Sequence, residues 1–252
     1  MSLLLLPERL FGVGHATSQK ANCFLANEIP GEVLNMKRFF ESHPAQVLVK
    51  ICGVTNQVDA EDAIEAGADA IGFNIVPRSK RYLDLGPASG WISELPPAVA
   101  RIVVAMDPTI DGALHLLSNE WVDALQLHGQ ESPDFCQLLG GKAGKPVIKA
   151  VPAIDRASVQ AAERYPVFAL LLDSSAGVTL GGTGKTFDWR KFAGLDLATP
   201  LIVSGGLTPE NVATAVRVLN PHAVDVATGV ELAPGRKDRI KMRDFVAAAK
   251  GL

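Results

Sequence analysis

The chain has 252 residues, a formal net charge of −3 and an apolar fraction of 48%. This length fits one large α/β domain or two small ones, and the weak negative charge argues against nucleic acid or an anionic membrane surface as a partner. Three cysteines, Cys23, Cys52 and Cys136, lie far apart without zinc-binding spacing, which suits a reducing, cytoplasmic location. No apolar run is long enough to span a bilayer, and the four leucines near the start are too few for a secretory signal.

Residues 1–46 show no clean hydrophobic period, and we expect a dispensable, poorly ordered extension. From residue 47 onward, short apolar runs alternate with amphipathic or alanine-rich stretches that predict helices. The apolar runs cover residues 47–51, 69–75, 100–106, 122–127, 146–151, 167–173, 200–205 and 223–228. Strands that alternate with helices predict parallel pairing through βαβ crossovers. Closure of these units predicts an α/β fold with a single (β/α)8 TIM barrel over residues 47–252.

An open doubly wound sheet is the competing architecture. It requires a GxGxxG motif after the first strand, and this chain has CGVTNQ at residues 52–57, so we favour the barrel. The clearest helix follows the seventh strand, where Thr208 can act as N-cap and Pro209 suits the first helical position. One face of this helix is apolar, and it is formed by Val212, Ala215, Val216 and Leu219.

Cys52 and Asp173 stand where a barrel places reactive groups, at the carboxyl ends of its strands. Cys52 ends the first strand in VKIC, and Asp173 ends the sixth in LLLD. The two strands lie on roughly opposite sides of the barrel mouth, so a small substrate fits between the thiol and the carboxyl, with one as base and the other as acid. The alternatives are a buried structural thiol for Cys52 and a helix cap or loop anchor for Asp173.

Lys50 shares a face of the first strand with Cys52, about 6–7 Å away along the strand. If Cys52 faces the mouth, Lys50 points into the barrel and needs a partner, because burial of an unpaired ammonium is costly. The eighth strand closes against the first and carries Asp225. We therefore predict a Lys50–Asp225 ion pair beneath the site. This pair either favours the thiolate of Cys52 through a residual positive field or is purely structural.

Glycines cluster in the loops after the last three strands, as GGTG at 181–184, SGG at 204–206 and TGVE at 228–231. Glycine lets bare backbone amides approach an anion. Barrels of this type frequently bind phosphate with the loops after strands seven and eight. The glycine loops therefore predict a phosphate site.

Arg81, in PRSKRYL after the second strand, is a second candidate for binding an anion, whereas Arg78 and Lys80 beside it are expected to be solvated. His128 follows the fourth strand in QLHGQE, where a histidine is more typical of a hydrogen-bonding loop residue than of a catalyst. No cluster of His, Asp and Glu in the sequence indicates a metal site, and no serine lies in a GxSxG setting.

From about residue 47 to its end, the chain resembles the phosphoribosylanthranilate isomerases of tryptophan biosynthesis. The resemblance rests on VKICGVTN, GADAIGF, PRSKRYL, LQLHGQE, LLLDS with GGTGKTFDW, SGGLTPENV, VDVATGVE and PGRKD. It implies an Amadori rearrangement of N-(5′-phosphoribosyl)anthranilate, the third step from chorismate to tryptophan, without a cofactor or a metal. A small phosphorylated substrate is the expected partner, and a monomer or homodimer is the expected state.

The resemblance also implies roles for individual residues. Asp173 is expected to protonate the ribose ring oxygen as general acid, and Cys52 to remove the C2′ proton as general base. Arg81 is expected to contact the anthranilate end. The remaining substrate contacts are expected from His128, Gly182, Gly205, Gly206, Asp225, Thr228 and Gly229. A thiol acts as a carbon base near pH 7 only if its pKa is close to that pH, so we expect a lowered pKa for Cys52.

Several strand ends depart from the family pattern. Asn74 stands where an apolar residue is commoner, Met106 and Asp107 end the third strand, and Ala227 stands where a serine is usual. Two other functions therefore stay open. One is isomerisation of a related aminoaldose phosphate, for which relatives use two aspartates rather than a cysteine. The other is a non-catalytic barrel that binds a phosphorylated metabolite, against which the presence of both candidate catalytic residues argues.

Overall fold

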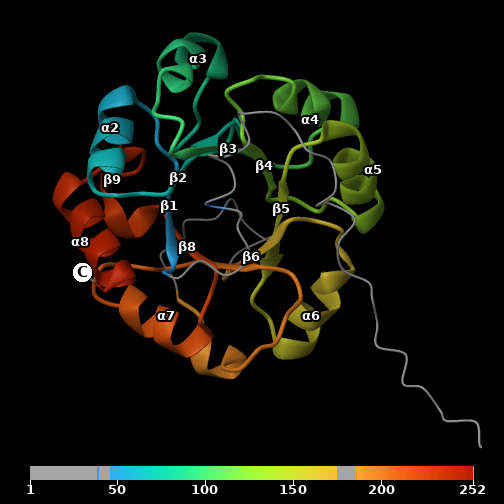
Figure 1. Ribbon diagram of the computed structural model, residues 1–252, viewed down its shortest axis with the longest axis vertical. Helices are drawn as coiled ribbons and strands as arrows, with labels where there is room; N and C mark the ends of the chain where they lie inside the picture. The colour runs from blue at the N-terminus through green and yellow to red at the C-terminus, as the bar shows by residue number, and fades with distance from the viewer. Residues whose placement is uncertain (1–38, 40–45, 175–185, 252) are drawn as a thin grey trace, which may run out of the picture. The chain divides into compact units, whose positions relative to one another are not determined.

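The computed structural model describes residue 39 and residues 46–174 and 186–251. Within this part, parallel strands close into a barrel in the order β1 to β8 (Figure 1). The strands are β1 Leu48–Cys52, β2 Ala70–Asn74, β3 Ala100–Ala105, β4 Ala124–Leu127, β5 Val147–Pro152, β6 Ala169–Asp173, β7 Leu201–Val203 and β8 Ala223–Val226. The predicted barrel is confirmed, because β1 pairs with β8 and no open sheet edge remains in this barrel. The predicted extension, residues 1–46, lies outside the described residues except for Phe39 and Gln46.

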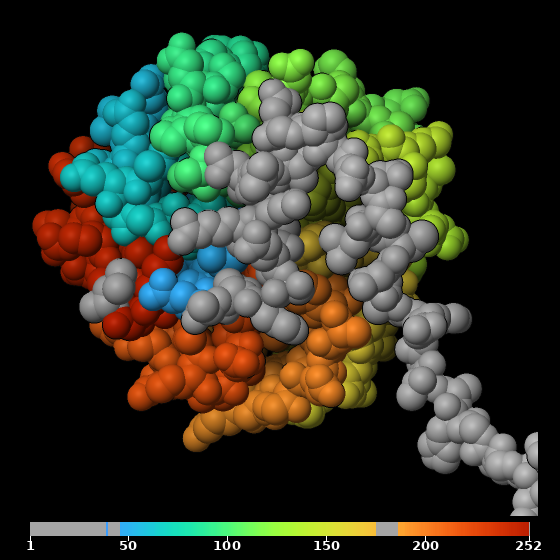
Figure 2. Space-filling view, in the orientation of Figure 1, coloured from blue at the N-terminus to red at the C-terminus, as the bar shows by residue number. Residues whose placement is uncertain are grey.

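Helices surround the strands and connect them in sequence (Figure 1). They are α2 Gln57–Glu65, α3 Leu85–Ser93, α4 Ile110–Leu117, α5 Pro133–Ala143, α6 Arg156–Ala161 with the 3-10 turn η1 Ala162–Arg164, α7 Val212–Leu219 and α8 Arg239–Lys250. The described part of the β6–β7 connection holds a 3-10 helix, η2 (Trp189–Phe192), rather than an α-helix. The ring closes where α8 packs against α2 and β1, and Figure 2 shows this contact as red beside blue-green.

Helix α7 begins later than its sequence predicts. The expected cap was Thr208, but the residue at the N-cap position is Asn211. The Asn211 side chain accepts a hydrogen bond from the Thr208 amide at 2.8 Å and donates one to the Gly206 carbonyl at 3.0 Å. These bonds hold the preceding residues in a turn, so the helix starts at Val212. Its apolar face is confirmed, since its buried residues are Val212, Ala215 and Leu219.

Alternation along the strands separates an outward apolar face from an inward face. In β4, for example, Leu125 and Leu127 pack toward the helices, whereas Ala124 belongs to the barrel interior. The lower interior, at the amino ends of the strands, is filled by small and aliphatic side chains from all of the barrel strands. They are Leu48, Ala70, Ala100, Ile102, Ala124, Ile148, Ala150, Ala169, Leu171, Ile202 and Ala223.

Phe39 joins this lower interior although it precedes β1. Its side chain is 2% exposed and belongs to the same apolar cluster. Its carbonyl is hydrogen-bonded to Nε2 of His222, the residue immediately before β8. The many interior alanines leave room that an aromatic ring can fill, which explains why a residue from outside the barrel packs there.

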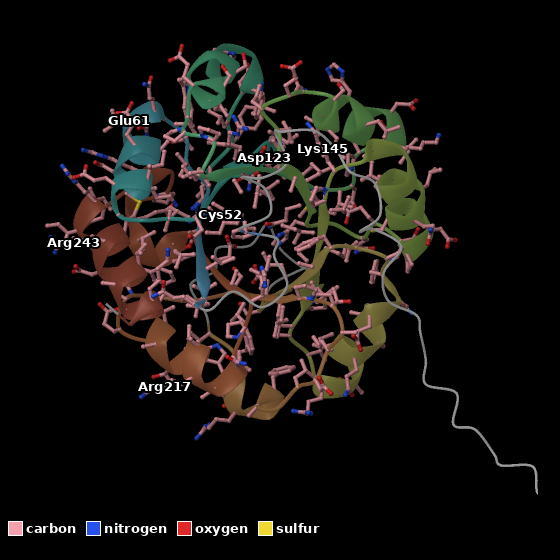
Figure 3. The ribbon with its side chains drawn as sticks, viewed as in Figure 1. Cys52, Glu61, Asp123, Lys145, Arg217 and Arg243 are labelled. Carbon is pink, nitrogen blue, oxygen red and sulfur yellow. The ribbon has the colours of Figure 1, made fainter. Side chains whose placement is uncertain are left out.

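The upper interior is polar, in contrast to the lower one. Lys50, Gln126, Asp173 and Asp225 are buried on inward positions of β1, β4, β6 and β8. Figure 3 shows Cys52 within the ring of helices, whereas Arg243 projects away from its helix on the outside. Burial of polar groups at the carboxyl ends of barrel strands is typical of a functional site.

Candidate functional site

A pocket lies at the carboxyl ends of the barrel strands, and we call it the mouth pocket. The predicted site residues that line it are Cys52, Arg81, His128, Asp173, Gly205, Gly206, Asp225, Thr228 and Gly229. The remaining predicted residue, Gly182, lies outside the described residues. Asn74, Met106 and Ala227, which depart from the family pattern, also line the pocket. Residues from the loops after β2 and β8 thus meet around one hollow, as expected for a barrel.

Cys52 reaches the mouth pocket because β1 ends there and the chain turns away at Gly53. The φ angle of Gly53 is +72°, in the left-handed region that favours glycine. A Cβ atom at this position would also collide with the side chain of Arg81, which passes directly over it. Cys52 is 9% exposed. The glycine after the strand therefore serves both the turn and the close approach of a second site residue.

The predicted Lys50–Asp225 ion pair is confirmed. The two residues are register partners across the β1–β8 seam, and Lys50 Nζ lies 2.7 Å from Asp225 Oδ1. The second carboxylate oxygen accepts a hydrogen bond from Ser204 Oγ at 3.1 Å. Lys50 Nζ is also close to Cys52 Sγ, because a Cβ built on Gly72 would lie 2.9 Å from the former and 2.8 Å from the latter. The ammonium thus stands beside the thiol, as the electrostatic hypothesis requires.

The expected lowering of the Cys52 pKa is wrong. Burial raises the pKa of this thiol, because a thiolate loses its hydration inside the barrel. The Lys50 ammonium opposes this rise and Asp225 adds to it, while Lys237 also lowers the pKa. The thiol form is therefore favoured in the free protein at neutral pH. The strand pattern revealed the cationic neighbour, but it did not reveal how deeply the sulfur is buried.

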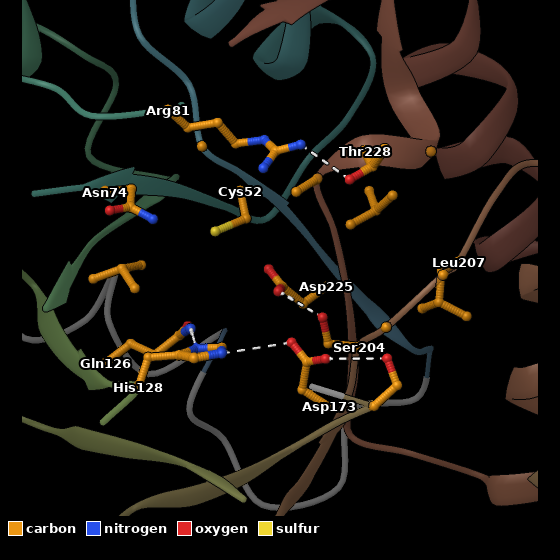
Figure 4. A pocket seen from close by; sticks show the side chains of 18 of the residues that line it. Cys52, Asn74, Arg81, Gln126, His128, Asp173, Ser204, Leu207, Asp225 and Thr228 are labelled. Atoms are coloured by element: carbon orange, nitrogen blue, oxygen red, sulfur yellow. Dashed lines mark hydrogen bonds and ion pairs between the residues drawn. The ribbon is translucent and has the colours of Figure 1, made fainter. Parts of the chain in front are cut away.

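Asp173 enters the mouth pocket from the end of β6 and is 5% exposed. Its Oδ2 atom lies 3.6 Å from His128 Nε2, and its Oδ1 atom accepts a hydrogen bond from Ser174 Oγ at 3.4 Å. Burial lowers the pKa of His128, although the Asp173 carboxylate opposes this effect, so the imidazole is neutral near pH 7. Figure 4 shows Cys52 and Asp173 entering the hollow from two sides.

Arg81 is held in the mouth pocket by an ion-pair network. Its Nε and Nη2 atoms donate to the two carboxylate oxygens of Glu231, each at 2.7 Å, and Nη2 also donates to Thr228 Oγ1 at 3.0 Å. Glu231 in turn accepts from Lys237 Nζ at 3.1 Å, and the same ammonium donates to the Cys52 carbonyl at 2.6 Å. The hydrogen bonds that Arg81 donates to Glu231 raise the pKa of Arg81, which keeps it cationic.

Sequence reasoning missed Glu231 and Lys237 as site residues. Both stand in motifs that the resemblance used, TGVE and PGRKD, but the partners Arg81 and Glu231 are 150 residues apart in the chain. It also missed Gln126, which lines the mouth pocket. The available signal for Gln126 was a polar residue between two leucines near the end of the fourth apolar run, VDALQL.

The loops after β7 and β8 form one wall of the mouth pocket. Gly205 and Gly206 have φ angles of +86° and +64°, so the chain turns sharply at the end of β7. The 3-10 turn η3, Thr228–Val230, follows β8 and lines the same wall through Thr228 and Gly229. Turns of this kind expose successive backbone amides, which suits an anion such as phosphate.

Other sequence expectations concern the surface and the ligands. Arg78 and Lys80 are exposed, as predicted. Among the residues that the structure describes, no group of three His, Cys, Asp or Glu side chains is placed to hold a metal ion. A search of the same residues finds no helix with the length and apolar character needed to cross a bilayer.

The fold and the mouth pocket define a (β/α)8-barrel enzyme with its site at the carboxyl ends of the strands. The model of the family N-(5′-phosphoribosyl)anthranilate (PRA) isomerase matches residues 49–248. A curated relative of that name from Geobacter sp. (strain M21) is 44% identical over 204 residues, which are 81% of this chain and 98% of the relative. The chain belongs to the N-(5′-phosphoribosyl)anthranilate isomerase family.

Solved structures agree with this assignment. The crystal structure of phosphoribosyl anthranilate isomerase from Thermotoga maritima has a TM-score of 0.75 and 42% identity, and the match covers 82% of this chain and 100% of that one. A second isomerase structure, in complex with reduced 1-(o-carboxyphenylamino)-1-deoxyribulose 5-phosphate, has a TM-score of 0.71 and 39% identity with the same coverage. The chain is thus an isomerase with a segment that extends beyond the length of these relatives.

Proposed function

We propose that this chain catalyses the Amadori rearrangement of N-(5′-phosphoribosyl)anthranilate to 1-(2-carboxyphenylamino)-1-deoxyribulose 5-phosphate, the third step from chorismate to tryptophan. One observation carries the proposal: Cys52 and Asp173 line the same pocket, with Arg81 and the glycine loops after β7 and β8 also lining it. A substrate with an anion at each end requires an anion-binding group at each end. The acid and base between these groups then act by position as much as by strength.

Asp173 begins the reaction as general acid. It gives a proton to the ribose ring oxygen, the bond from C1′ to that oxygen breaks, and the anthranilate nitrogen supplies the electron pair of the new C1′=N bond. The product of this step is an open-chain Schiff base. His128 lies beside this carboxyl group with a neutral imidazole, and its Nε2 atom is 3.6 Å from Asp173 Oδ2, beyond the range of a direct hydrogen bond.

Cys52 continues the reaction as general base. Its thiolate removes the proton from C2′, and the electron pair moves into a C1′=C2′ bond while the C1′=N bond becomes single. The resulting enolamine tautomerises to the ketone: C1′ gains a proton, and the oxygen on C2′ loses its hydroxyl proton as the C2′=O bond forms. Lys50 supports the thiolate, because its ammonium is the main group that lowers the pKa of Cys52 against the rise caused by burial.

The two ends of the substrate are bound by different chemistry. Arg81 is assigned to the anthranilate carboxylate, because Glu231 and Thr228 hold its guanidinium while it still lines the pocket. The backbone amides of Gly205, Gly206 and Gly229 are assigned to the phosphate. Asp225, Thr228 and the undescribed Gly182 are proposed as further contacts.

The rearrangement moves protons and electrons within one molecule, so the proposed mechanism uses neither a cofactor nor a metal. A biosynthetic enzyme of small metabolites suits the cytoplasm, as the cysteine content also suggests. The state in solution is proposed as a monomer or homodimer. One solved relative, the Thermotoga maritima isomerase, is described as dimeric.

Complementation of a tryptophan auxotroph that lacks this isomerase tests the proposed function. Wild-type chain should restore growth without tryptophan, whereas Asp173→Asn, expressed at the same level, should not. Cys52→Ser should also fail or grow slowly. Absence of growth from well-expressed wild-type chain would contradict the proposal, and it would favour a barrel that binds a phosphorylated metabolite without converting it.

A further inference from the structure

Gln126 is a buried polar residue of the mouth pocket for which the fold itself offers no reason. It lies on the inward face of β4, it is 1% exposed, and its neighbours Leu125 and Leu127 pack outward among the helices. Its Oε1 atom is buried and has no hydrogen-bond partner among the described residues. A buried acceptor without a donor destabilises the folded state. Packing alone would be better served by an aliphatic side chain of the same size.

The other end of the Gln126 amide is occupied by His128. Gln126 Nε2 lies 3.3 Å from His128 Nδ1. An amide nitrogen can only donate, so Nδ1 accepts and the imidazole proton resides on Nε2. That Nε2 atom lies 3.6 Å from Asp173 Oδ2, too far for a hydrogen bond, but an N–H there is attracted by the carboxylate. If the Gln126 amide were reversed, its oxygen would face Nδ1 and the imidazole proton would reside there. His128 Nε2, without a proton, would then face the Asp173 carboxylate, so two acceptors would lie opposite each other.

The contact with His128 therefore determines where Oε1 points. With Nε2 committed to the imidazole, the carbonyl oxygen of Gln126 is left over as an acceptor in the lining of the mouth pocket. Figure 4 shows Gln126 and His128 together on the side of the hollow that leads to Asp173. A ligand that lies between Cys52 and Asp173 occupies the pocket that Gln126 also lines. The complementary group is a hydroxyl, because a hydroxyl can donate to an amide oxygen.

We propose that Gln126 is a substrate-binding residue whose Oε1 accepts a hydrogen bond from a ribose hydroxyl, while its Nε2 holds His128 in the tautomer that faces Asp173. This inference rests on the proposed function, since it takes the sugar to lie between the acid and the base. Toward His128, Gln126 is a positioning residue. The hydrogen bond from the substrate then satisfies this oxygen, so binding recovers free energy that its burial costs the folded protein.

Gln126→Met tests the proposal, because methionine matches the shape of glutamine without its polar atoms. Removal of an unsatisfied buried oxygen should leave the Tm unchanged or raise it. The same change should lower kcat/KM about tenfold or more and weaken the binding of reduced 1-(o-carboxyphenylamino)-1-deoxyribulose 5-phosphate, measured by fluorescence titration. Gln126→Leu provides a second apolar variant in case methionine packs poorly.

Leu125→Met is the matched control, since it changes the neighbouring residue on the opposite face of β4 and should leave kcat/KM unchanged. A purely structural Gln126 would instead show a lower Tm in Gln126→Met with unchanged affinity for the reduced product, and this result would overturn the inference. If the wild type isomerises its substrate and Gln126→Met has the same kcat/KM, the inference about Gln126 is wrong while the proposed function stands. If the wild type itself is inactive, the proposed function fails and the inference falls with it.

Discussion

The two ends of the barrel interior differ sharply, although the same strands build both. At the amino ends, the interior is apolar throughout and includes Phe39, which is 2% exposed. At the carboxyl ends, inward positions carry Lys50, Gln126, Asp173 and Asp225, all of them buried. The lower end gains stability from packing, whereas the upper end gives up part of it to hold polar groups away from water. Substitutions at the two ends should therefore affect different measurements.

Asp173→Asn should give the largest effect at the upper end. Asparagine keeps the shape of the side chain but cannot give a proton to the ring oxygen, so kcat should fall about a thousandfold or more. The Tm should change little. Steady-state kinetics with the purified variant, followed through the fluorescence of the anthranilate group, measure this loss. Activity within a factor of ten of the wild type would remove Asp173 from its proposed role.

Phe39→Ala should give the opposite pattern, because it belongs to the lower end. Loss of a buried ring should cost about 3 kcal/mol of unfolding free energy and lower the Tm by roughly 10 °C. The kcat at 25 °C should stay close to that of the wild type. Phe39→Leu is the control, and it should lose less than half as much stability. A Phe39→Ala variant with an unchanged Tm would show that the residues before β1 contribute nothing to the barrel.

Arg81→Lys should separate binding from chemistry within the upper end. Lysine keeps the positive charge but cannot donate two parallel hydrogen bonds to Glu231, so the cation is no longer held in place. We expect the KM to rise about tenfold, with a smaller change in kcat, because the anthranilate end lies away from the reacting carbons. An unchanged KM would contradict the assignment of Arg81 to the substrate.

Lys50→Gln should change the pH dependence rather than the maximum rate. The charged groups that face Cys52 are Lys50 on its own strand, Asp225 on β8, Lys237 near the end of the chain and Arg81 after β2. The thiolate is the base, so activity rises with pH through the pKa of Cys52. Removal of the Lys50 charge should raise that pKa further and move this rising limb to higher pH.

The rate of Cys52 alkylation by iodoacetamide, measured against pH, checks this shift independently of turnover. Cys52→Ser supplies the background from Cys23 and Cys136. Asp225 loses its ion-pair partner in Lys50→Gln, and this loss could destabilise the fold. Circular dichroism therefore serves to check that the variant is folded. If the alkylation profile of Lys50→Gln coincides with that of the wild type, the role of the Lys50–Asp225 ion pair is purely structural.

Much of this contrast was predictable from sequence. The strand period located β1 to β8, and closure of the barrel brought Lys50 opposite Asp225, because both conclusions need only local pattern and a topology. Motif resemblance located Cys52, Asp173 and the glycine loops. Each of these inferences depends on order along the chain.

What sequence reasoning missed depends on three-dimensional packing. The burial of Phe39 and the Arg81–Glu231 pair are contacts between distant segments without a local signal. The direction in which the Cys52 pKa shifts depends on a balance between desolvation and the Lys50 charge, and only the depth of burial decides that balance. The free oxygen of Gln126 depends on the orientation of an amide beside His128.

A crystal structure of this protein with reduced 1-(o-carboxyphenylamino)-1-deoxyribulose 5-phosphate is the most direct test of the account. The account predicts the sugar chain in the mouth pocket, with the Asp173 carboxyl within hydrogen-bond distance of the oxygen that leaves the ring. It predicts Cys52 Sγ against C2 and the phosphate on the amides after β7 and β8. A ligand whose C2 lies away from Cys52, or whose phosphate binds elsewhere, would contradict it.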